Sequence, residues 1–222
     1  MLRRVCILAA LLSPTLPATA IRQLARETIS GFPAQELDRY IGDKAAIHAL
    51  VTMLRTSKES PYWSNAVAML GFISPYDAGL ASSLRKFIES DRPYAGCPDG
   101  TAQCGPQGKI SDSLQNAKLA SVFALADLAR KMDPASSGFP VDYLIEGVNP
   151  NAWQKKVRWN SQPHYLTDEE RNTELAERSI KALGLTCRPD ARAVLLKLQK
   201  ASTTKGPLAD ALAEALTYRC QP

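Results

Sequence analysis

The chain has 222 residues, of which 45% are hydrophobic and 22% charged, and its formal net charge at pH 7 is +5. Arg3 and Arg4 supply two of the positive charges, so a chain shortened after residue 20 would carry 25 basic and 22 acidic residues, a net charge of +3. An excess of this size is ordinary for a soluble domain and gives no reason to expect nucleic acid or an anionic membrane as a partner.

The N-terminus has the pattern of a secretory signal peptide. Arg3 and Arg4 precede the apolar run from Val5 to Leu12, and the sequence Pro17-Ala18-Thr19-Ala20 supplies small residues for a cleavage site. The apolar run is far shorter than the roughly 20 residues that a transmembrane helix needs. We therefore predict cleavage after Ala20 and an exported protein, periplasmic or secreted. It would have no integral membrane segment after cleavage and one helical domain over residues 21–222.

Helical periodicity dominates the rest of the chain, and no convincing run alternates in the manner of a β-strand. Ser74 is expected to cap the helix that starts at Pro75, and Thr167 is expected to form a capping box with Glu170. An all-α fold is therefore predicted. In chain order, we expect helices at 34–41, 43–56, 61–73 and 75–90, a loop at 91–109, a long helix at 111–132, an irregular stretch at 133–166 with short helices at 141–146 and 150–159, and helices at 167–185, 188–201 and 207–219.

Four cysteines remain after the predicted cleavage: Cys97, Cys104, Cys187 and Cys220. An even number in an exported chain indicates disulfides, and four cysteines allow three pairings. We expect the last two helices to form an antiparallel hairpin around a turn centred on residue 204. The sequence numbers of two residues that face each other in such a hairpin add up to about 408, and those of Cys187 and Cys220 add up to 407. We therefore expect these two to close the open end of the hairpin and Cys97 to pair with Cys104. A metal site, the alternative, would lack CxxC spacing and nearby histidines.

A weak internal repeat is present. Leu70-Gly71 followed by Asp77-Ala78 recurs as Leu183-Gly184 followed by Asp190-Ala191, with the same offset of 113 residues. In both copies a helix ends near Leu-Gly, and a second helix begins after a turn that contains proline.

Three segments, 65–73, 178–185 and 208–216, resemble the helices of HEAT-type repeats in their spacing of alanine, leucine and glycine. The resemblance implies a short right-handed α-solenoid of stacked antiparallel hairpins that binds other macromolecules on a groove. The alternative is an irregular helical bundle, because the repeats are unevenly spaced and long loops interrupt them.

The segment 153–165 is the candidate protein-binding site. It combines large aromatic side chains with cations in a stretch predicted to be mostly loop, and Trp, Tyr and Arg are common anchors of interfaces. The alternative is that the tryptophans attach the loop to the core while the cations are solvated. The candidate residues are Trp153, Lys155, Lys156, Arg158, Trp159 and Tyr165.

No catalytic motif, cofactor-binding motif or metal site is recognisable, and His48 is expected to be a core or surface residue. We therefore predict a non-enzymatic protein that binds another protein. One alternative is an inhibitor or immunity-type protein that neutralises a toxin or lytic enzyme. A second is an all-α glycan-cleaving hydrolase, in which Glu146 would be the acid and Asp142, four residues earlier, its partner carboxylate.

Overall fold

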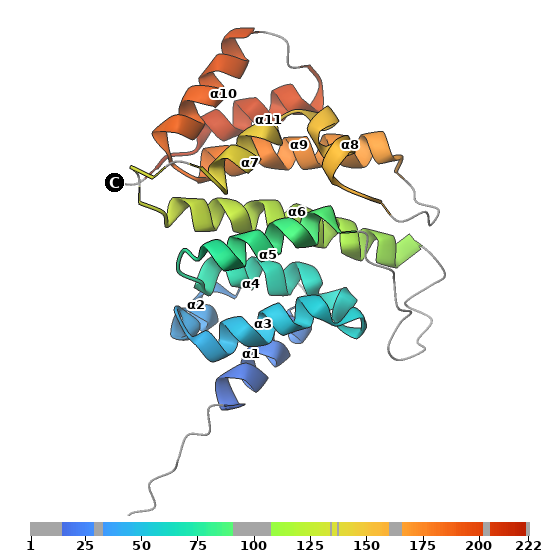
Figure 1. Ribbon diagram of the computed structural model, residues 1–222, viewed down its shortest axis with the longest axis vertical. Helices are drawn as coiled ribbons and strands as arrows, with labels where there is room; N and C mark the ends of the chain where they lie inside the picture. Colours follow the sequence, from blue (N-terminus) through green and yellow to red (C-terminus); the bar gives the residue numbers. More distant parts are fainter. Residues whose placement is uncertain are drawn as a thin grey trace, which may run out of the picture.

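The protein is all-α, as predicted. The computed structural model describes residues 15–28, 33–90, 108–133, 135–136, 138–159, 166–201 and 205–220, and every regular element within these ranges is a helix (Figure 1). The helices are α1 (Thr15–Glu27), α2 (Ala34–Leu37), α3 (Lys44–Arg55), α4 (Trp63–Ile73), α5 (Ala78–Glu89), α6 (Gly108–Arg130), α7 (Val141–Glu146), α8 (Pro150–Lys156), α9 (Asp168–Leu185), α10 (Pro189–Ala201) and α11 (Pro207–Thr217). Two 3₁₀ helices, Asp38–Tyr40 and Ser57–Tyr62, precede α3 and α4.

Several predicted helix ends need correction. The predicted helix at 34–41 is the short α2 followed by 3₁₀ helix, and Pro61 lies in the 3₁₀ helix before α4 instead of in its first turn. The predicted cap at Ser74 is wrong, because the Ser74 N–H still donates to Leu70 O at 3.1 Å and so ends α4. The cap of α5 is Asp77, whose carboxylate accepts a hydrogen bond from the Leu80 N–H at 2.5 Å.

The other predicted caps and helices agree more closely with the structure. At the start of α9, the Glu170 carboxylate accepts from the Thr167 N–H at 2.7 Å and Thr167 Oγ1 accepts from the Glu170 N–H at 3.2 Å, which confirms the capping box. Helices α7 and α8 confirm two short helices in the irregular stretch. Helix α6 begins at Gly108, three residues before its predicted start.

The helices follow one another along the long axis of the molecule (Figure 1). Helix α1 packs against α3, α3 against α4, α4 against α6, α6 against α9, and α9 against α11. Helices α5, α7, α8 and α10 pack beside this series, α5 on α6 and the others on α9. One continuous core of buried apolar side chains runs from Ile21 in α1 to Ala215 in α11.

The two Leu-Gly pairs of the weak repeat have the same structural role. A Cβ atom at Gly71 of α4 would lie 2.8 Å from the Cα of Ala124 in α6. A Cβ atom at Gly184 of α9 would lie 2.6 Å from the carbonyl oxygen of Ala215 in α11. Each glycine therefore allows two successive helices of the series to approach more closely than any side chain would permit.

We expect Gly184→Ala to lower the free energy of unfolding by about 1–3 kcal/mol, because the added methyl group overpacks the contact between α9 and α11. The higher helix propensity of alanine opposes this loss by about 1 kcal/mol. Urea unfolding followed by circular dichroism measures the difference. The control is Gly79→Ala on the exposed start of α5, where the nearest atom is the Asp77 carboxylate oxygen at 3.1 Å; here the helix propensity of alanine should leave the stability unchanged or raise it by up to about 1 kcal/mol. Equal stability of the two variants would contradict the close-packing argument.

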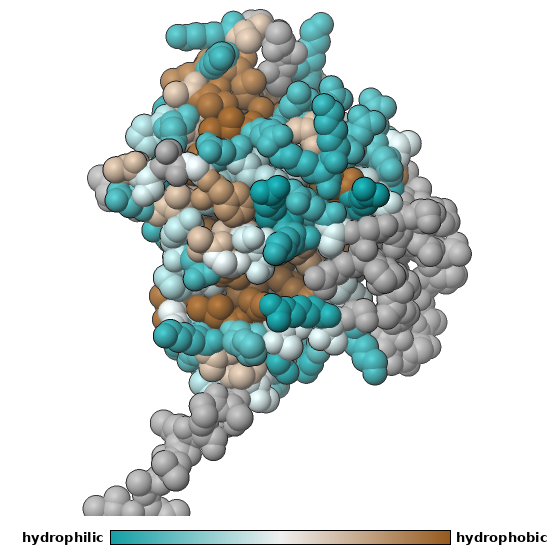
Figure 2. All heavy atoms as spheres, viewed as in Figure 1, coloured by the Kyte–Doolittle hydropathy of each residue, from teal (hydrophilic) through white to brown (hydrophobic). Residues whose placement is uncertain are grey.

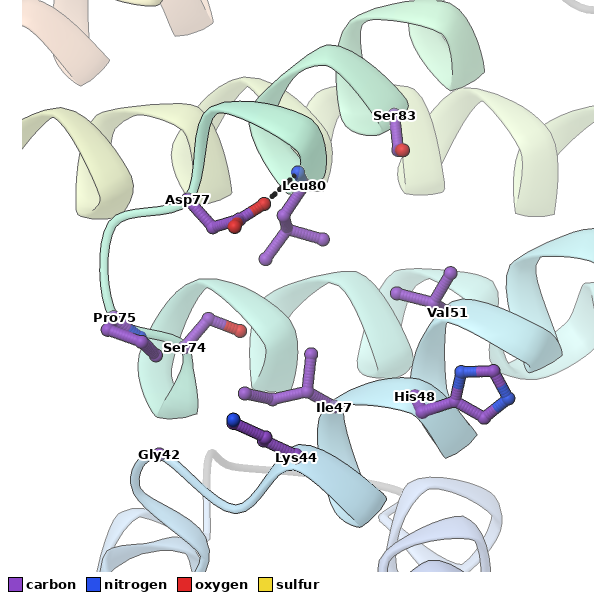
Figure 3. Close-up of a pocket in the computed structure, with 10 residues that line it drawn as sticks. All are labelled: Gly42, Lys44, Ile47, His48, Val51, Ser74, Pro75, Asp77, Leu80 and Ser83. Carbon is purple, nitrogen blue, oxygen red and sulfur yellow. Dashed lines mark hydrogen bonds between the residues drawn. The ribbon is translucent and has the colours of Figure 1, made fainter.

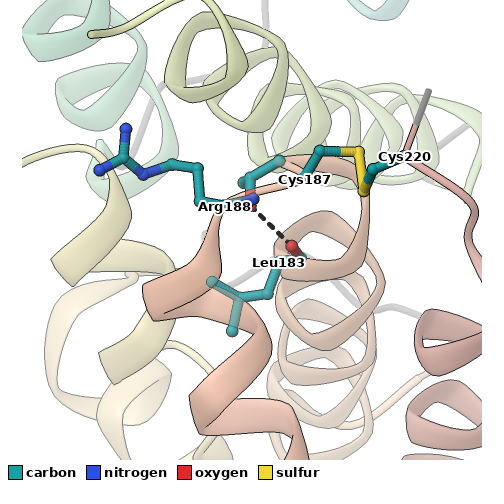
Figure 4. The surroundings of a disulfide bond; sticks show 5 residues. Leu183, Cys187, Arg188 and Cys220 are labelled. Carbon is teal, nitrogen blue, oxygen red and sulfur yellow. Dashed lines mark hydrogen bonds between the residues drawn. A yellow bond between two sulfur atoms is a disulfide. The ribbon is translucent and has the colours of Figure 1, made fainter. Parts of the chain in front are cut away.

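The predicted disulfide between Cys187 and Cys220 is present, with Cα atoms 5.3 Å apart (Figure 4). It joins the connection between α9 and α10 to the residues after α11, at the open end of the α10–α11 hairpin, as the turn geometry predicted. Cys97 and Cys104 lie outside the described residues, so their pairing stays a prediction.

The predicted cleavage point after Ala20 falls inside α1. The two fully buried side chains of α1, Ile21 and Ala25, follow that point, so a chain cleaved there would keep them. The rest of the predicted signal peptide, residues 1–14, lies outside the described residues.

Candidate protein-binding surface

Trp153 is fully buried, which is the reverse of what a direct contact with a partner requires. Its indole N–H donates to Gly147 O at 2.6 Å, and its ring packs edge-on against Tyr143 with centroids 5.4 Å apart. Val157, the residue after α8, is buried as well, and α8 itself packs against α9. Trp153 therefore attaches α8 to the core.

Trp159 is half-buried and attaches the end of the same segment to α6 and α9. Its indole N–H donates to Asn172 Oδ1 at 3.0 Å. Lys118 Nζ and Arg171 Cζ each lie 4.6 Å from the centre of a Trp159 ring, within range of a cation–π interaction. Burial lowers the pKa of the Arg171 guanidinium, while the charge of Asp168 opposes that effect. The interpretation that the tryptophans attach this segment to the core is thus the one that the geometry supports.

The remaining candidates of the segment are placed differently from one another. Lys155 and Arg158 are exposed, and Lys156 pairs with Glu146 while its ammonium lies 4.7 Å from the Tyr143 ring centre. Tyr165 lies outside the described residues. Of the five described candidates, Lys155 and Arg158 have the most accessible side chains.

Glu146 lacks the apolar environment that the hydrolase alternative needs. Its side chain is 59% exposed and its carboxylate pairs with Lys156. Asp142, its proposed partner, is also exposed. A general acid at neutral pH needs a raised pKa, which usually comes from burial in apolar surroundings. Burial of that kind is not found at Glu146.

A groove that the sequence did not predict lies between α3 and α5, the helices that precede and follow α4 in the chain. Its wider half is a cavity of about 440 Å³ lined by the N-terminal halves of both helices and by the turn before α5. Ile47 and Val51 point from α3 toward Leu80 of α5 across this cavity (Figure 3). His48 of α3 is exposed at its edge.

The groove continues along the C-terminal halves of the same two helices. A second cavity of about 220 Å³ is lined by Leu54, Leu84 and Phe87, and shares Val51, Leu80 and Ser83 with the first. Because the shared residues join the two cavities, we treat them as one feature, the α3–α5 groove. Figure 2 shows apolar surface on the viewed face at the level of these helices. Ile41, the most exposed large apolar side chain among the described residues at 60%, precedes the lining residue Gly42.

Cations outnumber acids among the residues that line the groove. Lys44 and Arg55 of α3 and Lys86 of α5 line it and are exposed, and none has an ion-pair partner in the described part of the chain. The acid that lines it is Asp77, whose carboxylate already accepts the capping hydrogen bond of α5. The α3–α5 groove therefore combines an apolar floor with a basic rim.

The sequence contained a partial signal for this groove. Ile47 and Val51 belong to the apolar pattern of the predicted helix at 43–56, beside Leu50 and Leu54. Leu50 is fully buried, whereas Ile47 and Val51 are only partly buried. The apolar stripe of α3 is thus wider than the part that the core buries, and its partly exposed residues line the groove.

Compared with known proteins, the chain matches no family model, no curated protein sequence and no solved structure. Its likeness to HEAT-type repeats therefore stays a prediction from the sequence. No helix in the described ranges combines the length and the apolar character that crossing a membrane requires. In the same ranges, His, Cys, Asp and Glu side chains nowhere gather in a group of three that could hold a metal ion.

Proposed function

We propose that this chain is an exported, non-enzymatic helical protein that binds another protein, and that the α3–α5 groove is its binding site. The observation that carries the proposal is the pair of apolar side chains Ile47 and Val51, which the protein's own described residues leave partly exposed in the groove opposite the buried Leu80. Connected apolar surface with a polar rim is characteristic of interaction sites on soluble proteins.

The arrangement of the groove favours a macromolecule over a small substrate. The groove is open along two helices of 12 residues each, whereas a small-molecule site usually encloses most of its ligand. The segment 153–165, the binding site predicted from the sequence, offers less to a partner. Its two tryptophans pack against the rest of the protein, and Lys155 and Arg158 are its exposed charges. Exposed rim charges influence association rates more than affinity, so we assign this segment a secondary role at most.

The proposal is tested by blocking the groove without removing any core contact. Ser83 is exposed and lines both cavities, so Ser83→Trp places a large ring in the groove while sparing the buried residues. Proteins of the native envelope fraction are captured on the immobilised protein and quantified by mass spectrometry. We expect at least one captured protein to fall roughly tenfold with Ser83→Trp, which corresponds to about 1.4 kcal/mol of binding free energy.

The matched control is Gln199→Trp, which adds the same ring to an exposed position on α10. It should capture the same proteins as the wild type. If Ser83→Trp and Gln199→Trp capture identical sets in equal amounts, the α3–α5 groove is not the binding site and the proposed function is wrong as stated.

A further inference from the structure

We infer that the occupant of the α3–α5 groove is an acidic amphipathic helix of about three turns, supplied by the partner protein. This inference rests on the proposed function and adds the chemistry of the partner. Three features of the groove carry it: the length and direction of its two helices, the spacing of its apolar side chains, and the charge of its rim.

The length of the groove is that of a short helix. Helices α3 and α5 have 12 residues each, so at 1.5 Å per residue each is about 18 Å long. Their N-terminal halves line the wider cavity and their C-terminal halves line the second, so the two helices run in the same direction along the groove. A third helix of about 12 residues would lie between them over its whole length.

The apolar side chains of the floor lie at helical spacing. Ile47, Val51 and Leu54 are three or four residues apart on α3, and Leu80, Leu84 and Phe87 repeat the same steps on α5. Ile47 and Val51 are partly exposed, whereas Leu54, Leu80, Leu84 and Phe87 are buried. The occupant would therefore contact mainly the α3 row, with its own apolar stripe turned toward it as in other helix-in-groove complexes. The occupant should therefore carry apolar residues at every third or fourth position on one face.

The charge of the rim determines the polar face of the occupant. Lys44, Arg55 and Lys86 supply three cations without ion-pair partners in the described ranges. Asp77, the acid that lines the groove, and Asp43, the residue before Lys44, are the N-caps of α5 and α3 and accept backbone hydrogen bonds there. A carboxylate on the occupant would meet an available cation, whereas a lysine would meet like charge. Complementary rim charges give specificity and faster association, so an acidic helix is favoured over a neutral or basic one.

The test uses three fluorescein-labelled peptides of about 14 residues, the length of four helical turns. All have leucines three or four residues apart, and the positions beside the leucines hold glutamate, glutamine or lysine. Binding to the whole protein is followed by fluorescence anisotropy at about 50 mM and about 150 mM salt. We expect the glutamate peptide to bind at least tenfold more tightly than the glutamine peptide at low salt, and the lysine peptide to bind least. The advantage of glutamate should shrink at the higher salt concentration, because salt screens exposed charges.

Charge-reversal variants test the rim directly. We expect a variant with three reversed charges on the rim of the groove to reverse the order of the glutamate and lysine peptides. A control variant with the same change in net charge, on α10 and on the connection between α10 and α11, should keep the wild-type order. Ser83→Trp should weaken all three peptides at least tenfold. The groove variant is Lys44→Glu, Arg55→Glu, Lys86→Glu, and the control is Lys197→Glu, Lys200→Glu, Lys205→Glu, at positions that are all exposed.

Three outcomes would overturn the inference. The first is equal affinity for the three peptides, or no binding of any. The second is a glutamate preference that the control variant loses as fully as the groove variant, which would reflect net charge alone. The third is self-association of the protein that Ser83→Trp abolishes, since a second copy would then be the occupant. If Ser83→Trp removes a captured protein while the peptides fail, the proposed function stands and only the acidic-helix inference is wrong.

Discussion

Replacing Trp153 with alanine should lower the free energy of unfolding by about 3–5 kcal/mol, the usual cost of removing a large aromatic side chain from a core. The side chain is fully buried and packs against Tyr143. Its removal also leaves the Gly147 carbonyl, which accepts the indole N–H at 2.6 Å, without that donor. Urea unfolding followed by circular dichroism and tryptophan fluorescence measures the loss. Because small domains are commonly stable by only about 5–15 kcal/mol, the variant should unfold at a much lower urea concentration.

Two matched variants separate burial from charge in the same helix. Lys155→Ala, two residues along α8 and exposed, should change the stability by less than about 0.5 kcal/mol. Trp153→Phe should lie between the wild type and Trp153→Ala, because it keeps an apolar ring but loses the indole donor. A loss below about 1 kcal/mol for Trp153→Ala would place this side chain at the surface and restore it as a candidate contact.

Removing the Cys187–Cys220 disulfide should cost about 3–4 kcal/mol in the chain-entropy model, because the bond closes a loop of 33 residues in the unfolded chain. The double variant Cys187→Ser, Cys220→Ser avoids a free thiol. Its urea midpoint, compared with that of the oxidised wild type, gives the loss. Since the bond closes the end of the α10–α11 hairpin, hydrogen exchange should accelerate first in these two helices.

Reduction provides the internal control for the disulfide. A reducing agent should move the wild type toward the stability of the double variant, and any further change that reduction causes in the double variant itself belongs to other cysteines. If the oxidised wild type and the double variant unfold at the same urea concentration, the bond does not stabilise the folded state.

The sequence predicted helices better than it predicted their ends. Periodic apolar residues and the Thr167–Glu170 capping box locate α3, α6 and α9 to within a few residues, because these signals are local. The cap of α5 could not be assigned so well, because Ser74 and Asp77 both suit the N-cap and the end of α4 decides between them. The Cys187–Cys220 pairing was predictable because a hairpin determines which residues face each other.

The candidate site was less accessible from the sequence, for a physical reason. Whether Trp153 contacts the core or a partner depends on the position of α9, which the residues of α8 do not specify. The α3–α5 groove likewise depends on the placement of two helices that are separated in the chain by α4. Local patterns show which faces are apolar. They do not show which of those faces another helix covers.

The order in which α4, α6, α9 and α11 contact one another has a consequence for how this chain can be compared with others. Neighbours in this series are joined by connections of unequal length: α5 and a long segment in one case, α7 and α8 in the next, and α10 in the last. The helices of this series contact one another in a regular order, but they do not recur at a constant spacing along the sequence. A search for a constant sequence period would therefore detect the series only where two connections have the same length.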